Sequence, residues 1–135
     1  MTESVRIFVP GVPVPKGRPR FGRGRVFTPK KTRAYEDTIR LEATLAMKGR
    51  KPMTGPVKLF LTAWLPIPKS WSATKRRDVY AGRIRHTSKP DLDNLIKMVD
   101  SLNGIVVQDD SQIVGIEACK FYAEDVGLSF IVVPA

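Results

Sequence analysis

The eleven prolines set the strongest limits on how this chain can fold. Proline lacks a backbone N–H and resists the interior of helices and of central strands, so each one marks a boundary. Pro10 ends a short alternating strand over residues 5–9, and the segment 10–29 holds too much proline and glycine for a regular helix. A second strand over residues 57–65 begins after one proline and ends at the next. Pro90 keeps the residue before it out of helical angles, so a helix begins there or just after.

Two longer helices are expected. Residues 32–48 form the first, with Thr32 as its N-cap and Gly49 as its C-terminal stop. Residues 91–103 form the second, because their apolar side chains recur at spacings of three and four. That stripe consists of Leu92, Leu95, Ile96, Val99 and Leu102. A short basic helix is also expected after Ser72.

Two more strands are predicted over residues 113–121 and 128–133. The hydrophobic fraction of 42% supplies an ordinary core, and the length of 135 residues suits one domain. We therefore expect an α+β fold in which a small mixed β-sheet packs against two main helices. Residues 1–135 should form that single domain.

The formal net charge of +10 and the pI of about 10.1 favour nucleic acid as the partner. No apolar run is long enough for a membrane span, and none resembles a signal peptide. Cys119 is the sole cysteine, which excludes an internal disulfide and suits a reducing cytoplasm; we expect it to be buried. His86 is the sole histidine, which excludes zinc motifs with two histidines. No Walker A loop and no other small-molecule cofactor motif is present.

Basic residues gather in two stretches that we expect to contact DNA. The proline-rich segment is either a linker or an ordered loop that meets a ligand, and its charges would repel one another without phosphates. The residues expected to bind DNA in and after this segment are Lys16, Arg18, Arg20, Arg23, Arg25, Lys30, Lys31 and Arg33. Those expected in the second stretch are Lys75, Arg76, Arg77, Arg83, Arg85 and Lys89.

The carboxylates crowd into two places. Asp91 and Asp93 stand at the start of the second helix, where both side chains can turn toward one site, and Asp109 and Asp110 form an acidic turn. Close carboxylates repel unless a cation lies between them, and Mg²⁺ takes oxygen ligands. A structural interpretation is also open, because acidic residues cap helix N-termini and Asp93 could pair with Lys97 on the helix surface.

These residues carry a resemblance to a known family. The chain resembles the RusA family of Holliday-junction resolvases, often carried by bacteriophages and prophages, in the order and spacing of four segments. These segments are PVPKGRPRF, VFTPKKTRAYE, KPDLDNLIKMVDSLNG and VVQDDSQI. The resemblance spans roughly residues 5 to 133 and implies a RusA-like fold. The long stretch from Pro66 to Lys89 departs from the family pattern and makes nuclease chemistry a firmer expectation than junction specificity.

The resemblance also implies the site. Asp91, Asp93 and Asp110 match the family's essential acidic residues and would hold the metal, Mg²⁺ with Mn²⁺ as an alternative, while Lys97 matches its catalytic lysine. It implies a homodimer that makes paired nicks in four-way DNA junctions during recombination and repair. Two rival functions stay open: a non-enzymatic, basic nucleic-acid-binding protein, and a nuclease for flaps or forks.

Overall fold

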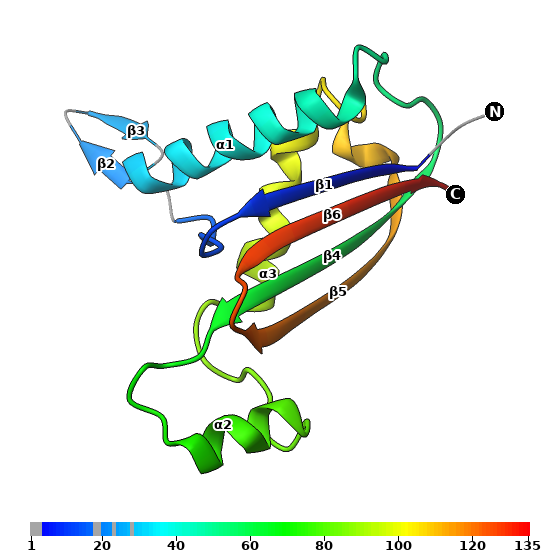
Figure 1. The fold of residues 1–135 in the computed structure, drawn as a ribbon. Helices are drawn as coiled ribbons and strands as arrows, with labels where there is room; N and C mark the ends of the chain where they lie inside the picture. The colour runs from blue at the N-terminus through cyan, green and yellow to red at the C-terminus, as the bar shows by residue number, and fades with distance from the viewer. Residues whose placement is uncertain (1–3, 18–19, 23, 28) are drawn as a thin grey trace.

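A four-stranded mixed sheet with the strand order β1-β6-β4-β5 is the centre of the fold (Figure 1). This computed structural model describes residues 4–17, 20–22, 24–27 and 29–135. β6 pairs antiparallel with β1 and β4, whereas β4 and β5 run parallel. β1 and β5 therefore form the two edges of the sheet. The four strands are β1 (Val5–Pro10), β4 (Val57–Pro66), β5 (Ile113–Ala123) and β6 (Gly127–Pro134).

Helices cover one face of this sheet and leave the other open (Figure 1). The covering layer consists of α1 (Lys30–Met47), α3 (Leu92–Ile96) and the 3-10 helix η1 (Lys97–Leu102). Burial alternates along β4, and its inward side chains, such as Leu59 and Leu61, are buried in the core beneath the helices. The α+β class and the mixed sheet predicted from the sequence are confirmed.

The parallel pairing of β4 with β5 requires a long crossover, since the chain must return to the end where β4 began. That crossover carries α2 (Ala73–Tyr80), α3, η1 and the 3-10 turn η2 (Asp110–Gln112). α2 projects beyond the end of the strands, and α3 and η1 then run back behind the sheet (Figure 1). The predicted catalytic residues, Asp91, Asp93, Lys97 and Asp110, thus all lie in the crossover between β4 and β5.

The expected helix over 91–103 is divided. It is α-helical only from Leu92 to Ile96 and continues as the 3-10 helix η1. Leu95, Met98 and Leu102 are fully buried in the core. An apolar stripe at spacings of three and four suits both 3.6 and 3.0 residues per turn, so the stripe predicted the buried face but not the winding.

Thr32 does not cap α1, which begins earlier, after Pro29. Thr32 is buried instead, and its hydroxyl accepts a hydrogen bond from the Gly17 backbone N–H at 3.0 Å. The helix ends in a left-handed residue at Lys48 (φ 51°), followed by Gly49, as expected for a C-terminal stop. The threonine therefore ties the N-terminal segment to the helix rather than capping it.

Cys119 is exposed, which corrects the expectation of a buried thiol. It pairs with Thr62 across the parallel ladder and so shares the open side of the sheet.

In the N-terminal segment a two-stranded antiparallel ribbon forms from β2 (Arg20–Gly22) and β3 (Arg25–Phe27). No helix in the described part of the chain is long and apolar enough to cross a membrane.

Candidate active site

Asp91 and Asp93 lie at the start of α3, as the sequence predicted. Asp91 is the N-cap residue and has extended backbone angles, while Asp93 is in the first turn. The half-buried Asp91 carboxylate accepts a hydrogen bond from Lys89 Nζ at 3.0 Å. The exposed Asp93 carboxylate has no hydrogen bond or ion pair with any described residue. Asp93 is therefore available to a ligand, whereas Lys89 is engaged by Asp91.

Lys97 is exposed at the C-terminal end of α3 and does not pair with Asp93. Its Nζ donates to Asn94 Oδ1 at 3.2 Å, one helical turn back. The surface ion pair that the alternative interpretation required is therefore not formed. A neutral amide holds the ammonium group on the solvent side of α3, where its charge is not neutralised.

The acidic turn assigns different roles to its two carboxylates. Asp109 is the N-cap of η2, and its Oδ2 accepts the Ser111 backbone N–H at 3.0 Å. Hydrogen bonds from the Ser111 side chain and backbone hold the pKa of Asp109 below its usual value. Asp110 is exposed, and among the residues that the structure describes its carboxylate has no partner. Asp109 is thus the structural member of the pair, and Asp110 is free for a ligand.

Gln112 anchors this turn and was not singled out from the sequence. Its Oε1 accepts the backbone N–H groups of Gln108 and Asp109, at 2.8 and 3.0 Å. Its Nε2 donates to the carbonyls of Met53 and Gly55, both at 2.9 Å. The available signal was the capping-box spacing, in which a glutamine follows the N-cap by three positions. Asp110 is therefore held next to the loop that precedes β4.

The start of α3 is anchored near the other end of the sheet. Lys120 on β5 donates from Nζ to the carbonyls of Ser88, at 2.8 Å, and Pro90, at 3.0 Å. The next inward residue, Tyr122, packs against the ring of His86 with centroids 4.5 Å apart. These contacts place the backbone that leads into Asp91. The sequence offered no sign of them, because they join segments about thirty residues apart.

His86 occupies this anchor as a buried neutral ring. It is 8% exposed, and its Nδ1 is buried and has no hydrogen-bond partner among the described residues. Burial, and then the charge of Lys120, lower the pKa of His86 below its usual value. A protonated ring is therefore disfavoured in the folded chain.

Lys16, expected to contact DNA, is engaged inside the protein. Its Nζ forms ion pairs with Asp100 on η1 and with the buried Glu36 on α1, the latter at 3.9 Å. Its backbone N–H donates to the Asn94 carbonyl at 3.0 Å. Lys16 therefore links the N-terminal segment to the helix that carries Asp93.

The other predicted DNA-binding residues fall into three groups. Arg18 and Arg23, and the side chains of Arg20 and Arg25, lie outside the described residues. Arg83 pairs with Asp78, Lys75 lies over the Trp71 ring, and Arg76 donates to backbone carbonyls. Exposed side chains with no carboxylate partner in the described part of the chain are those of Lys30, Lys31, Arg33, Arg77 and Arg85.

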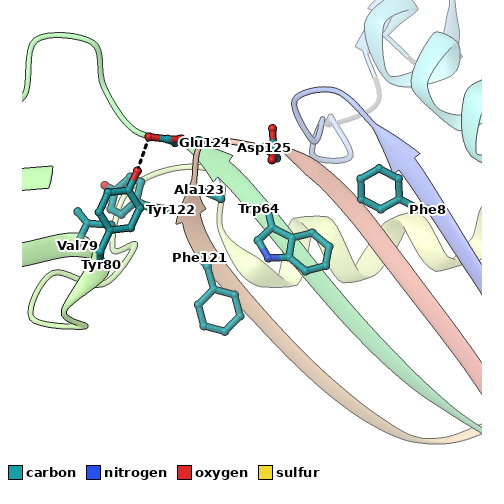
Figure 2. Close-up of a pocket in the computed structure, with 9 residues that line it drawn as sticks. All are labelled: Phe8, Trp64, Val79, Tyr80, Phe121, Tyr122, Ala123, Glu124 and Asp125. Carbon is teal, nitrogen blue, oxygen red and sulfur yellow. Dashed lines mark hydrogen bonds between the residues drawn. The ribbon is translucent and has the colours of Figure 1, made fainter. Parts of the chain in front are cut away.

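A cleft lies elsewhere, between the open face of the sheet and α2 (Figure 2). Its volume is about 720 Å³, and Tyr80 closes one side by donating to Glu124 Oε1 at 2.8 Å. The Phe8 ring lies over Gly127, where a Cβ atom would come within 2.4 Å of the ring. The centroids of the Phe8 and Trp64 rings are 6.2 Å apart. None of the predicted catalytic residues lines this cleft.

The predicted metal ligands have the donor atoms that a hard divalent cation prefers, but a single chain does not bring these ligands together. Asp91, Asp93 and Asp110 offer only carboxylate oxygens, the ligands that Mg²⁺ prefers. Within the described ranges no three His, Cys, Asp or Glu side chains are close enough together to hold a metal ion. Asp91 follows the Lys120 anchor, whereas Asp110 is beside the loop before β4. The predicted ligands fit the metal in chemistry and do not converge within a single chain.

Comparison with known proteins places these residues in a family context. A family model described as endodeoxyribonuclease RusA matches residues 10–132, a span that includes every carboxylate discussed above. A protein of Bacillus subtilis (strain 168), uncharacterized protein YqaN, is 35% identical over 130 residues. The match covers 91% of each of the two chains.

The buried His86 predicts a loss of stability in mild acid. The unfolded chain takes up a proton near pH 6.5, whereas the folded chain resists it, so the free energy of unfolding should fall as the pH drops below about 6.5. Urea denaturation at about pH 7.5 and about pH 5.5 measures this change, and His86→Phe, which removes the sole histidine, should reduce it. Equal losses in wild type and variant would contradict the assignment.

Proposed function

The chain belongs to the RusA family of endodeoxyribonucleases, and from this premise we propose that it resolves four-way (Holliday) DNA junctions in a metal-dependent reaction. The observation that carries the proposal is the pair of carboxylates, Asp93 and Asp110, that have no partner among the described residues, in a protein with a net charge of +10. A protein built only to hold DNA gains nothing from exposed negative charge on its binding surface. A nuclease needs such oxygens to recruit a cation.

The proposed ligands of Mg²⁺, or of Mn²⁺ in its place, are Asp91, Asp93 and Asp110. A bound divalent ion activates water and stabilises charge on a phosphoryl oxygen. Lys97, held by a neutral amide, keeps a positive charge that can be directed at a phosphate oxygen as negative charge develops there. Asp109 takes no part in this scheme, because it caps the turn that presents Asp110.

DNA would be held by the exposed basic residues that have no carboxylate partner in the part of the chain that the structure describes. Lys30, Lys31 and Arg33 project from the first turns of α1, and Arg77 and Arg85 lie on and after α2. Each side chain of this kind can contact a backbone phosphate and displace a counterion. The proposed partner is thus branched DNA, held through its phosphates.

A homodimer completes the proposal. Resolution of a four-way junction requires two symmetric cuts, and a two-fold dimer presents two identical sites to a substrate with two-fold symmetry. A chain of 15.1 kDa with one set of carboxylates is consistent with this requirement.

The decisive experiment compares labelled four-way junctions, forks, flaps and linear duplex, each with Mg²⁺ and with a chelator. Paired nicks in the junction that require Mg²⁺ support the proposal. Stronger cleavage of forks or flaps would assign the chain to those substrates instead. Binding of junctions without cleavage of any substrate would identify a non-enzymatic DNA-binding protein.

Replacing Asp91, Asp93 or Asp110 singly with Asn should reduce cleavage by about 10²-fold or more, because each change removes a negative ligand. Junction binding in chelator should be retained, since the loss of negative charge does not weaken the hold on a polyanion. Asp125→Asn, in the turn between β5 and β6, is the matched control and should cleave normally. Any one of the three variants cutting at the wild-type rate excludes that residue as a ligand.

Lys97→Ala should lower the cleavage rate far more than the junction affinity. One ammonium among 23 basic residues matters little for binding, whereas one donor directed at developing charge is worth about 10²–10³ in rate. Single-turnover rates and dissociation constants for this variant and for Lys51→Ala, an exposed lysine between α1 and β4, separate the two effects. Equal losses in rate and affinity would make Lys97 an ordinary phosphate contact.

A further inference from the structure

The backbone that leads into Asp91 is not held by hydrogen bonds to other backbone groups. Ile84 donates its N–H to the Asp78 carbonyl at 3.3 Å, and the Asp91 carbonyl accepts the Asn94 N–H at 3.2 Å. Between these two points, in residues 85–90, no backbone N–H or carbonyl pairs with another backbone group of the described chain. Polar backbone groups in a folded chain need other partners, so the position of this segment depends on side chains.

Lys120 on β5 supplies such partners. Its Nζ donates to the carbonyl of Ser88 at 2.8 Å and to that of Pro90 at 3.0 Å. Lys120 lies opposite the buried Ala63 in the parallel ladder, so its side chain leaves β5 on the face that the helices cover. Hydrogen bonds from an ionised donor are roughly twice as strong as those between neutral groups. No other described side chain binds the backbone of this segment.

The bond to Pro90 acts on the peptide group that precedes a predicted metal ligand. The Pro90 carbonyl and the Asp91 nitrogen belong to one planar unit, so the lysine fixes the plane from which the Asp91 Cα atom extends. The Asp91 backbone is extended there, with φ −69° and ψ 143°, before the chain enters α3. The carboxylate extends from that Cα atom, so a rotation of the plane would displace the carboxylate with it.

Tyr122 holds the same segment at a second point. Alternate residues of a strand point to one face, so its ring lies on the same side of β5 as Lys120. The Tyr122 ring is 4.5 Å from the buried His86 ring and 5.0 Å from the Trp71 ring, measured between centroids. The end of β5 thus holds the approach to α3 through ring contact at His86 and through hydrogen bonds from Lys120.

We propose that Lys120 is a positioning residue of the nuclease site, which sets the direction of the Asp91 carboxylate through the Pro90 peptide group and contacts neither metal nor DNA. The inference rests on the proposed function and deepens it. An ammonium group has three donors, and carbonyls engage two of them in Lys120, unlike in the exposed basic residues proposed to hold DNA. Misplacement of a reacting group by about 1 Å can lower a rate about 10²-fold. Lys120 therefore contributes to cleavage from a strand outside both acidic segments.

Replacing Lys120 with Met tests this role, because the change removes the donors and keeps the length of the side chain. Lys120→Met should lower the single-turnover rate of junction cleavage in Mg²⁺ by about 10²-fold. The junction affinity in chelator, and the dependence of that affinity on salt, should stay at wild-type values. Lys58→Met is the matched control and should cleave like the wild type. Lys58 lies on the neighbouring strand β4 and pairs with Glu117 at 3.9 Å on the open face of the sheet.

Hydrogen–deuterium exchange without DNA or metal gives a readout that does not depend on cleavage. Without the lysine, the start of α3 should open more often, so the amides of residues 94–96 should exchange several-fold faster in Lys120→Met than in the wild type. Lys58→Met should leave them unchanged. Lys120→Gln, which keeps neutral donors on a shorter side chain, should show both effects to a smaller extent, and it replaces Lys120→Met if that variant does not fold.

The two readouts separate this proposal from the nuclease function. Cleavage by Lys120→Met at the wild-type rate, or unchanged exchange in α3, overturns the positioning role. A weaker junction affinity with a salt dependence flatter by about one unit also overturns it, because Lys120 is then a phosphate contact. If the wild type cuts no DNA and Lys120→Met still loosens α3, the anchor stands and the nuclease function falls.

Discussion

The parallel pairing of β4 with β5 is the constraint on which the rest of the structure depends. Two parallel neighbours cannot be joined by a tight turn, so the chain must leave one end of the sheet and return to the other. The return path contains α2, α3, η1 and η2, and with them the predicted catalytic residues. Asp91 therefore lies after α2, where the crossover turns back, and Asp110 lies in η2, its last turn. Among the described residues, no strand pairs with the other side of β5.

Side chains bonded to the main chain hold the acidic segments in place. Lys120 binds two carbonyls before α3, and Gln112 binds two carbonyls before β4. Lys16 connects the N-terminal segment to η1 between these two anchors. None of these three residues leaves its polar group free to act on a substrate. These side chains orient the backbone, and within the described ranges the carboxylates of Asp93 and Asp110 have no partner.

The sequence predicted the four strands of the main sheet and α1 well. Apolar residues recur at every second position in a strand and at every third or fourth position in a helix, and this spacing depends only on which side faces the core. It located Asp91, Asp93 and Asp110 on the correct local elements for the same reason. It did not predict the division of the helix at Lys97, since two kinds of helix share one apolar stripe. It also did not predict the internal partners of Lys16, because charge alone does not distinguish a solvent-facing lysine from one that faces a buried glutamate. Convergence of the carboxylates is a matter of tertiary distance, which motif spacing does not encode.

The close approach of Phe8 to Gly127 couples two positions that are far apart in the chain. A methyl group at position 127 would meet the Phe8 ring at 2.4 Å, so the ring would have to leave β6 and its neighbour Trp64. A larger residue at position 127 therefore requires a smaller side chain at position 8, so we expect substitutions at these two positions to be coupled. The open face of the sheet thus has a packing requirement of its own, although Phe8 is half exposed to solvent.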